Sequence, residues 1–290
     1  MGPRPLDSLH PDFGVVAPVV DAILAAGGGQ AGIEQHVPMI LRTAIDEVID
    51  TPRTGRFLIE QTEKTEKTYL GTKVEILLRA WLGFPKGSVL DMSINGTECD
   101  IKNTMHYNWS IPRENVGRMA MLVKASEKKG VCSFGVAVLH DAYLNPGRNQ
   151  DKKRTMSAIG QQNIWWIIDG HPYPVNFWRM MTAPQREALM NAGKGTRRIA
   201  MLFETIQRRP ISRQQVEDLA QQHDYMKRLR ANGGARDLLR PKKIAVLWGS
   251  RDRDAISYLG LGPVTKEEFV SVSPKNAAEE FYLRSEGYID

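Results

Sequence analysis

Cysteine is scarce in this chain, with two residues among 290. Cys99 and Cys132 both fall in runs that we interpret as strands, and neither has a CxxC partner or a neighbouring cluster of histidines. A structural zinc site needs about four Cys and His ligands at close spacing. The sequence therefore argues against a zinc-stabilised fold, and nothing in it requires a disulfide.

Long apolar runs are also lacking. The longest, 15–26, is interrupted by Asp21 and is too short to cross a bilayer. The N-terminal residues do not show the basic segment and small-residue cleavage site of a secretory signal. We therefore expect a soluble, cytoplasmic protein without a membrane partner.

Charge is distributed unevenly along the chain. Hydrophobic residues make up 42% and charged residues 25%, an ordinary globular composition, and the formal net charge is +6. Residues 195–253 hold 14 Lys and Arg against 6 Asp and Glu, a net charge of +8, so the remainder is slightly acidic. A nucleic-acid-binding domain joined to a carboxylate-bearing domain would show this segregation. A basic surface that is merely solvated explains the charges equally well.

The length of 290 residues predicts two domains, since a domain averages ~150 residues. The apolar pattern predicts helices at 15–26, 36–49, 69–82 and 161–168. It predicts strands at 88–94, 97–102, 118–125 and 131–140. Helices and a sheet within the first half indicate a mixed α/β (α+β) domain. Two prolines and a glycine predict a linker at 169–175, between a first domain at 1–168 and a second at 176–290.

A hairpin is the most informative local pattern. Asn95-Gly96 separates two strand-like runs, and this dipeptide favours a type I′ turn, which needs positive φ at both central residues. A two-residue turn pairs Ile94 with Thr97. Asp91 then falls opposite Asp100 on the same face, with Cβ atoms ~5 Å apart.

Like charges that face each other destabilise a hairpin unless a cation lies between them, and hard divalent cations prefer carboxylate oxygens. Lys102 follows Asp100 by two positions and therefore points to the same face. Asp91 and Asp100 can thus hold a metal ion, while the Lys102 amine orients or deprotonates a water molecule that attacks a phosphate. On spacing alone, solvent-facing residues on the polar side of a hairpin are the simpler interpretation.

Glu75 is a further candidate on the helix that precedes the hairpin. It lies in the apolar run Val74-Glu75-Ile76-Leu77-Leu78, where a charged side chain is costly without a partner. A metal site would supply that partner. An exposed position paired with Arg79 would explain the residue as well.

A helix Glu, an Asp and an Asp-x-Lys in this order resemble the core of the PD-(D/E)xK nucleases. Over roughly 53–261 the chain further resembles the NaeI-type type II restriction endonucleases. The segments that carry this resemblance include Arg53-Thr54-Gly55-Arg56, Lys64-Thr65-Glu66-Lys67-Thr68, Ile111-Pro112 with Glu114, Gly233-Gly234-Ala235-Arg236 and Leu239-Arg240-Pro241. A lone D…DxK is common, whereas the whole constellation in one order is specific. The sequence departs most from that family before Arg53 and after about Gly262.

The resemblance implies a prokaryotic enzyme with a restriction-endonuclease-like core in which Asp91 and Asp100 bind Mg²⁺, assisted by the backbone carbonyl of Ile101. It implies that Lys102 positions the attacking water, and that Glu75 acts through metal or water at the edge of the site. The family has Cys where Ile101 stands, and we expect that side chain to face away from the metal. Oxygen ligands favour Mg²⁺ over Zn²⁺.

The second domain has the pattern of a winged helix-turn-helix. Helical spacing at 197–208, a Ser212–Gln215 capping box and a third helix at about 224–231 precede a strand at 244–248. The third helix would lie in the major groove of DNA. A structural three-helix unit with a solvated basic face is the alternative. The resemblance favours the DNA-binding version and implies that this domain binds an effector DNA.

Basic residues of both domains are candidate DNA contacts: Arg53, Arg56, Lys64, Lys67, Lys227, Arg228, Arg230, Arg236 and Arg240. Those before the Glu75 helix are expected to contact backbone phosphates, although charged loops are often only solvated. Arg236 and Arg240 are candidate phosphate clamps or, alternatively, salt-bridge partners of Asp237.

The combined pattern predicts a type II restriction endonuclease that hydrolyses double-stranded DNA with Mg²⁺, leaving a 5′-phosphate and a 3′-hydroxyl. Concerted cleavage of two strands needs two active sites and so predicts a homodimer, and the resemblance implies activation by a second DNA site. A nuclease directed at modified bases or mismatches is one alternative. A DNA-binding regulator with an inactive core is another, but the intact Asp91, Asp100 and Lys102 argue against it.

Overall fold

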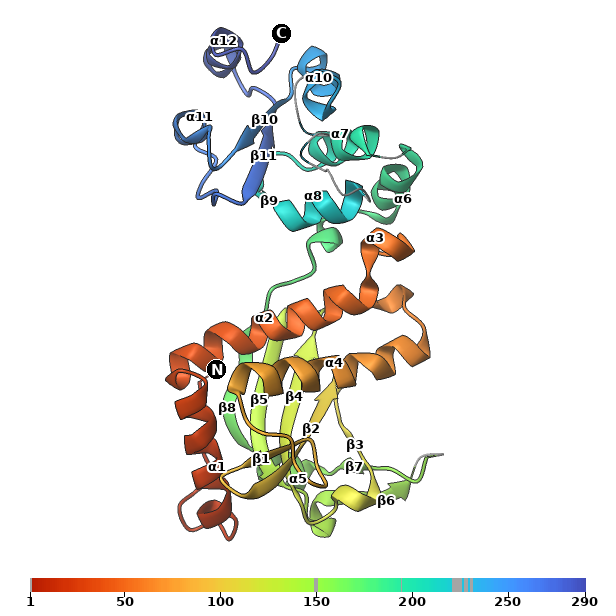
Figure 1. The fold of residues 1–290 in the computed structure, drawn as a ribbon, viewed down its shortest axis with the longest axis vertical. Helices are drawn as coiled ribbons and strands as arrows, with labels where there is room; N and C mark the ends of the chain where they lie inside the picture. The colour runs from red at the N-terminus through yellow and green to blue at the C-terminus, as the bar shows by residue number, and fades with distance from the viewer. Residues whose placement is uncertain (1, 149–150, 194, 221–225, 227–228, 230–231) are drawn as a thin grey trace. The chain divides into compact units, whose positions relative to one another are not determined.

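Figure 1 shows the fold in a computed structural model, which describes residues 2–148, 151–193, 195–220, 226, 229 and 232–290. Internal contacts divide the chain into two compact units. Unit 1 comprises Met1–Ile49 and Leu58–Phe177, and unit 2 comprises Asp50–Phe57 and Trp178–Asp290. This division differs from the expected linker at 169–175, and it groups Asp50–Phe57 with the second unit.

A five-stranded sheet in the order β1-β2-β4-β5-β8 forms the centre of unit 1. Its strands are β1 (Met92–Ile94), β2 (Thr97–Thr104), β4 (Met119–Ser126), β5 (Val131–Val138) and β8 (Trp165–Pro172). β2 and β4 run parallel, and the other neighbours are antiparallel. The predicted strands at 97–102, 118–125 and 131–140 correspond to β2, β4 and β5, whereas β1 is shorter than the predicted 88–94.

Three helices pack on one face of this sheet: α1 (Phe13–Ala26), α2 (Gly29–Ile49) and α4 (Lys64–Leu82). α2 and α4 begin earlier than the predicted helices at 36–49 and 69–82. At the start of α4, the Glu63 backbone N–H donates to the Glu66 carboxylate (2.7 Å) in a capping box, and Gly83 at φ 71° ends the helix. Its buried stripe, Leu70, Val74, Leu78 and Leu82, holds the helix over the sheet.

Among the described residues, no single helix is both long and apolar enough to cross a membrane. Two consecutive segments, Phe13–Ala26 and Gly29–Thr54, are long and apolar enough to cross a membrane only when they are counted as one span, and the chain bends between them.

A smaller sheet in the order β3-β7-β6 belongs to the opposite side of the central sheet. It consists of β3 (Ser110–Ile111), β7 (Arg154–Met156) and β6 (Leu144–Arg148), and it is accompanied by α5 (Ala158–Gln162). Trp109, Leu122 and Trp166 are buried together in this second core. The 3₁₀ helix η2 (Arg113–Asn115) connects β3 to β4 and places one side chain beside the hairpin.

The predicted helix at 161–168 is wrong. α5 ends at Gln162, and Trp165–Pro172 forms β8, which pairs with β5 and includes the first residues of the expected linker. Trp166 faces the second core, while Ile167 and Ile168 belong to the first. A short apolar run buried on both faces of a sheet has the same composition as a buried helix, so the pattern does not separate the two.

Unit 2 contains α3 (Thr51–Thr54), α6 (Ala183–Asn191), α7 (Thr196–Thr205), α8 (Arg213–Ala220), α10 (Ala235–Leu239), α11 (Arg253–Tyr258) and α12 (Ala277–Ser285). Its antiparallel sheet has the order β10-β11-β9, formed by β10 (Ala245–Trp248), β11 (Glu268–Val272) and β9 (Ile211–Ser212). The predicted Ser212–Gln215 capping box is present, with reciprocal bonds of 2.7 and 3.2 Å. The predicted helix at about 224–231 lies largely outside the described residues, as do Lys227, Arg228 and Arg230. Within it, Leu229 is buried as expected.

Candidate active site

β1 and β2 form the predicted hairpin around Asn95 (φ 49°) and Gly96 (φ 82°), which tolerate these left-handed conformations. Ile94 pairs with Thr97, as the two-residue turn requires. Continued by three positions, this register sets Asp91 opposite Asp100, although Asp91 lies just before β1. The turn thus decides which two carboxylates come together.

Alternation along β2 separates its chemical face from its core face. Cys99 and Ile101 are buried in the core beneath the helices. Asp100 and Lys102 point to the opposite face, because neighbouring residues of a strand alternate. The Ile101 side chain is therefore directed away from the carboxylate of Asp100.

Asp100 is a buried carboxylate, with 4% of the residue exposed. Its Oδ2 accepts a hydrogen bond from Lys102 Nζ at 2.5 Å and another from the side-chain amide of Asn115. Burial, followed by the neighbouring Asp91, raises the pKa of Asp100 to about 7, while Lys102 acts in the opposite direction. Near neutral pH this carboxyl is thus balanced between its two protonation states, and an added cation would favour the ionised one.

Asp91 is fixed by the strand opposite. Its Oδ2 accepts the backbone N–H of Ile101 at 2.7 Å, while its own backbone carbonyl accepts from Arg79 Nη1 at 3.1 Å. Both carboxylates therefore use an Oδ2 atom for a bond within the fold, and the two side chains also interact with each other.

Glu75 lies at the edge of this group. Its Oε1 accepts from Arg79 Nη1 at 3.3 Å, so the ion pair with Arg79 is present. Burial, followed by the charge of Asp91, raises the pKa of Glu75, so the two carboxylates influence each other. Among the described residues, no group of three or more His, Cys, Asp and Glu side chains is arranged to hold a metal ion. The structure thus joins Asp91, Asp100 and Lys102, with Glu75 beside them.

Two further residues shape this site. Asn115, buried at the end of η2, bonds to Asp100, and Glu98 organises the loop that leads to Asp91. The Glu98 carboxylate accepts the backbone N–H groups of Ser88, Val89 and Leu90 at 2.7–3.2 Å. These bonds, those of Leu90 and Ser88 first, lower the pKa of Glu98 to about 2. Sequence reasoning missed both, because neither has a distinctive spacing to the predicted carboxylates.

A cleft of about 720 Å³ in unit 1 includes Lys102 in its wall. Lys64 and Lys67 at the start of α4 also line it, together with Lys128 and the segment from Asn103 to Ser110. Two of the predicted DNA contacts thus share a cleft with the catalytic candidate Lys102. Arg53 and Arg56 instead belong to unit 2, where Arg53 is exposed and its Nε lies 2.8 Å from the Asp50 carboxylate.

Comparison with known proteins identifies the relationship of this chain. A family model described as restriction endonuclease NaeI matches residues 32–281. The chain is 32% identical over 242 residues to the type II restriction enzyme NaeI of Lentzea aerocolonigenes, which covers 80% of this chain and 76% of that relative. This chain belongs to the NaeI restriction endonuclease family. It is therefore a restriction endonuclease, and the match extends on both sides of the 53–261 region that carries the sequence resemblance.

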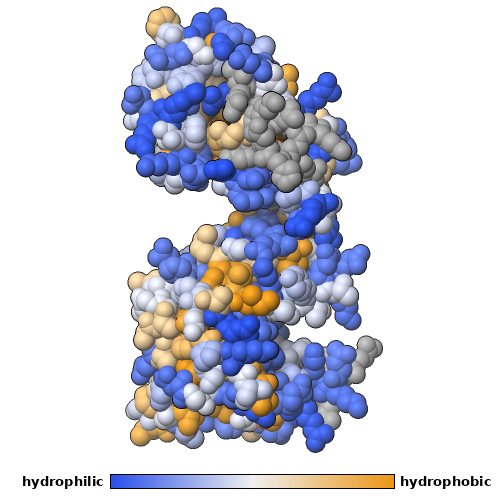
Figure 2. Space-filling view, in the orientation of Figure 1, coloured by the Kyte–Doolittle hydropathy of each residue, from blue (hydrophilic) through white to orange (hydrophobic). Residues whose placement is uncertain are grey.

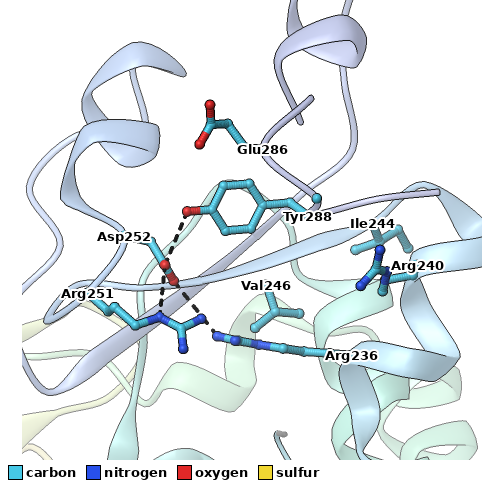
Figure 3. A pocket seen from close by; sticks show the side chains of 9 residues that line it. Arg236, Arg240, Ile244, Val246, Arg251, Asp252, Glu286 and Tyr288 are labelled. Atoms are coloured by element: carbon cyan, nitrogen blue, oxygen red, sulfur yellow. Dashed lines mark hydrogen bonds and ion pairs between the residues drawn. The ribbon is translucent and has the colours of Figure 1, made fainter. Parts of the chain in front are cut away.

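Two of the predicted arginines of this NaeI-family enzyme, Arg236 and Arg240, line a pocket in unit 2 (Figure 3). Arg236 Nη2 lies 3.8 Å from the Asp252 carboxylate, and Arg240 Nε lies 3.0 Å from that of Asp290. Asp237 instead accepts the backbone N–H of Gly233 at 2.5 Å. The structure thus pairs these arginines with Asp252 and Asp290, whereas the Asp237 carboxylate bonds to the preceding loop.

We expect Glu98→Gln to lower the cleavage rate of this NaeI-family enzyme roughly tenfold, because outer residues that orient a metal ligand have effects of this size. The glutamine offers one oxygen where the carboxylate offers two, so the loop before Asp91 loses part of its support. Since the pKa of Glu98 is about 2, the loss should be the same at pH 6 and pH 8. Single-turnover cleavage measures it, with Glu34→Gln on α2 as the control. Equal rates for the two variants would show that the loop needs no such support.

Proposed function

We propose that this NaeI-family enzyme is a type II endonuclease that hydrolyses double-stranded DNA at specific sites with Mg²⁺, using Asp91, Asp100 and Lys102. The supporting observation is the pair of adjacent carboxylates on one face of the hairpin, next to Lys102, which itself lines a lysine-lined cleft. A buried carboxyl whose pKa is raised to about 7 is typical of groups that bind a cation or exchange a proton.

The donor set fits Mg²⁺. This ion usually takes one or two carboxylates together with waters and substrate phosphates, so two adjacent acids are sufficient. Asp91 and Asp100 would hold it, with the carbonyl of Ile101 as a further oxygen and Glu75 acting through water. When bound, the ion supplies positive charge that activates water and stabilises the phosphate during attack.

The surrounding residues prepare this chemistry. Lys102 Nζ lies 2.5 Å from Asp100 Oδ2, and from there it would orient the attacking water against the phosphate. Asn115 donates to the same oxygen and thereby fixes the orientation of the carboxylate. We assign Asn115 a positioning role, since it acts through Asp100 rather than on the DNA.

DNA would lie along the cleft of unit 1, with Lys64 and Lys67 contacting backbone phosphates. Arg53 and Arg56 would be phosphate contacts of unit 2. Cleavage of both DNA strands needs two active sites, which favours a homodimer. Apolar side chains on the outer face of α2 and α4 offer it a surface (Figure 2), where Met39 and Ile76 are 52% and 40% exposed.

For unit 2 we propose a winged helix-turn-helix that binds a second, activating DNA site. The order α7, β9, α8, β10 and β11, with β11 between the other two strands, supports this fold. Lys227, Arg228, Arg230, Arg236 and Arg240 would be its phosphate contacts.

The test is digestion of unmethylated phage DNA by the full chain in Mg²⁺, with EDTA, Asp91→Asn and Asp141→Asn as comparisons. Asp141 is a carboxylate of unit 1 whose side chain is 76% exposed and pairs with Arg154 outside the cleft. We expect discrete fragments from the wild type and from Asp141→Asn, and none with EDTA or Asp91→Asn.

Other outcomes would contradict the proposal in distinct ways. Intact DNA that is nevertheless bound would contradict cleavage of unmodified sites, and modified or mismatched substrates would then separate a modification-directed nuclease from a regulator. Fragments that persist in EDTA would contradict the metal requirement. Equal cleavage of substrates with one and two sites would contradict activation by a second site.

A further inference from the structure

The pocket in Figure 3 lies entirely within unit 2 and has a volume of about 300 Å³. Three arginines line it from separate elements: Arg236 from α10, Arg240 from the 3₁₀ helix η5 (Arg240–Lys242), and Arg251 from the turn after β10. Val246 of β10 contributes an apolar wall between them. The pocket therefore gathers three guanidinium groups in a small volume.

Asp252 is the buried carboxylate of this pocket, with 4% of its side chain exposed. Its Oδ1 accepts from Arg251 Nε and from the Tyr288 hydroxyl, both at 3.2 Å. Its Oδ2 accepts the backbone N–H of Trp248 at 2.7 Å and lies 3.8 Å from Arg236. One negative charge thus faces two guanidinium groups, and most of its acceptor capacity is already used.

Of these two guanidinium groups, that of Arg236 has the less complete set of hydrogen bonds. Its Nε is buried without a hydrogen-bond partner among the described residues, and burial, opposed by Asp252, lowers its pKa. Buried guanidinium donors left unbonded are costly. Arg240 is directed to Asp290, and in Figure 3 Glu286 lies beyond the Tyr288 ring from Arg236 and Arg251. The excess positive charge therefore remains beside Arg236 and Arg251.

We propose that this pocket binds one phosphate group, held between Arg236 and Arg251. A phosphate carries the negative charge needed to balance the two arginines, and its oxygens match the planar fork of a guanidinium group. The phosphate can belong to a DNA backbone or be a free anion. If the phosphate belongs to DNA, this proposal rests on the function proposed for unit 2. If the phosphate is a free anion, it does not.

The experiment measures thermal unfolding and calorimetric binding of the full chain in sodium phosphate, against sodium chloride at equal ionic strength. We expect a saturable stabilisation by phosphate alone. Arg251→Gln should weaken phosphate binding roughly tenfold, the usual effect of losing a charge-assisted hydrogen bond. The Arg251 side chain is 62% exposed, so this substitution leaves the fold intact. Arg284→Gln is the control, since Arg284 is 53% exposed and pairs with Glu280 outside the pocket.

Asp252→Asn provides a test of opposite sign. Removal of this buried carboxylate increases the excess positive charge, so we expect phosphate to bind several-fold more tightly. Two results would overturn the proposal. One is that chloride stabilises the chain as much as phosphate does. The other is that the response to phosphate is unchanged in both Arg251→Gln and Arg236→Gln.

Mixed-sequence duplex DNA, bound in EDTA, distinguishes the two sources. If Arg251→Gln weakens both phosphate and DNA binding, the pocket takes a backbone phosphate. If it weakens phosphate binding alone, the pocket takes a free phosphate, and both results support the site. A chain that binds phosphate saturably but fails to cut DNA would contradict the proposed nuclease function and leave this pocket standing.

Discussion

Asp100→Asn is expected to lower the rate of DNA cleavage ~10³-fold or more at pH 8 in saturating Mg²⁺, because a bound metal contributes several kcal/mol to stabilising the transition state. Asparagine keeps the size of the side chain and an oxygen that accepts from the Asn115 amide. It removes the negative charge that would hold the proposed cation. Single-turnover cleavage of plasmid DNA measures the rate, with binding to the same DNA in Ca²⁺ measured alongside.

The same variant should be more stable than the wild type at pH 8 in EDTA. The pKa of Asp100 is raised to about 7 in the folded protein from an ordinary value of 3.8, so the folded state binds this proton more tightly than the unfolded state. The stability linked to Asp100 is therefore complete below about pH 4 and is lost as the pH rises through 7. Asparagine does not titrate, so the gain should be on the order of 1–3 kcal/mol at pH 8.

Thermal unfolding at pH 8 and at pH 5 checks this second result. The difference between Asp100→Asn and the wild type should narrow at the lower pH, while Asp141→Asn should follow the wild type throughout. A variant that is both inactive and less stable at pH 8 would show that Asp100 is a structural carboxylate. Loss of activity with gained stability is the signature of a charge retained for catalysis.

The hairpin could be predicted because its determinants are local. Asn95-Gly96 sets the turn, the turn sets the register, and the register brings Asp91 to Asp100. The two-residue alternation of a strand then places Lys102 with Asp100 and removes Ile101 to the core. Each step follows from backbone geometry over a few residues, so no tertiary knowledge was needed.

Features that depend on distant partners could not be predicted. Asn115 meets Asp100 only because η2 leads into β4, which pairs in parallel with β2. Trp165–Pro172 forms a strand because β5 offers an edge and both faces are covered, which its composition does not reveal. Arg236 finds Asp252 from a different element rather than Asp237 on its own helix. In each case the tertiary fold, and not the local sequence, determines which residue or strand becomes the partner.

Asn115→Ala is expected to raise the Mg²⁺ concentration for half-maximal cleavage by ~10-fold or more, the usual effect of removing an outer partner of a metal ligand. The Asn115 amide and Lys102 Nζ both donate to Oδ2 of Asp100. Without the amide, the carboxylate loses a bond that fixes its orientation, so it should hold the proposed cation less well. Saturating Mg²⁺ should restore most of the rate, since the chemical groups themselves remain. A titration of the single-turnover rate with Mg²⁺ measures the shift.

Asn145→Ala is the matched control for Asn115→Ala. The Asn145 amide donates to Thr155 Oγ1 at 2.9 Å and to the carbonyl of Met156 at 3.2 Å within the smaller sheet of unit 1. Its loss removes hydrogen bonds of the same kind without touching Asp100, so the Mg²⁺ dependence should stay at the wild-type value. Asn115→Ser, which keeps a donor, should fall between wild type and Asn115→Ala. If Asn115→Ala lowers the melting temperature as Asn145→Ala does but leaves the Mg²⁺ dependence unchanged, Asn115 supports the fold and not the carboxylate.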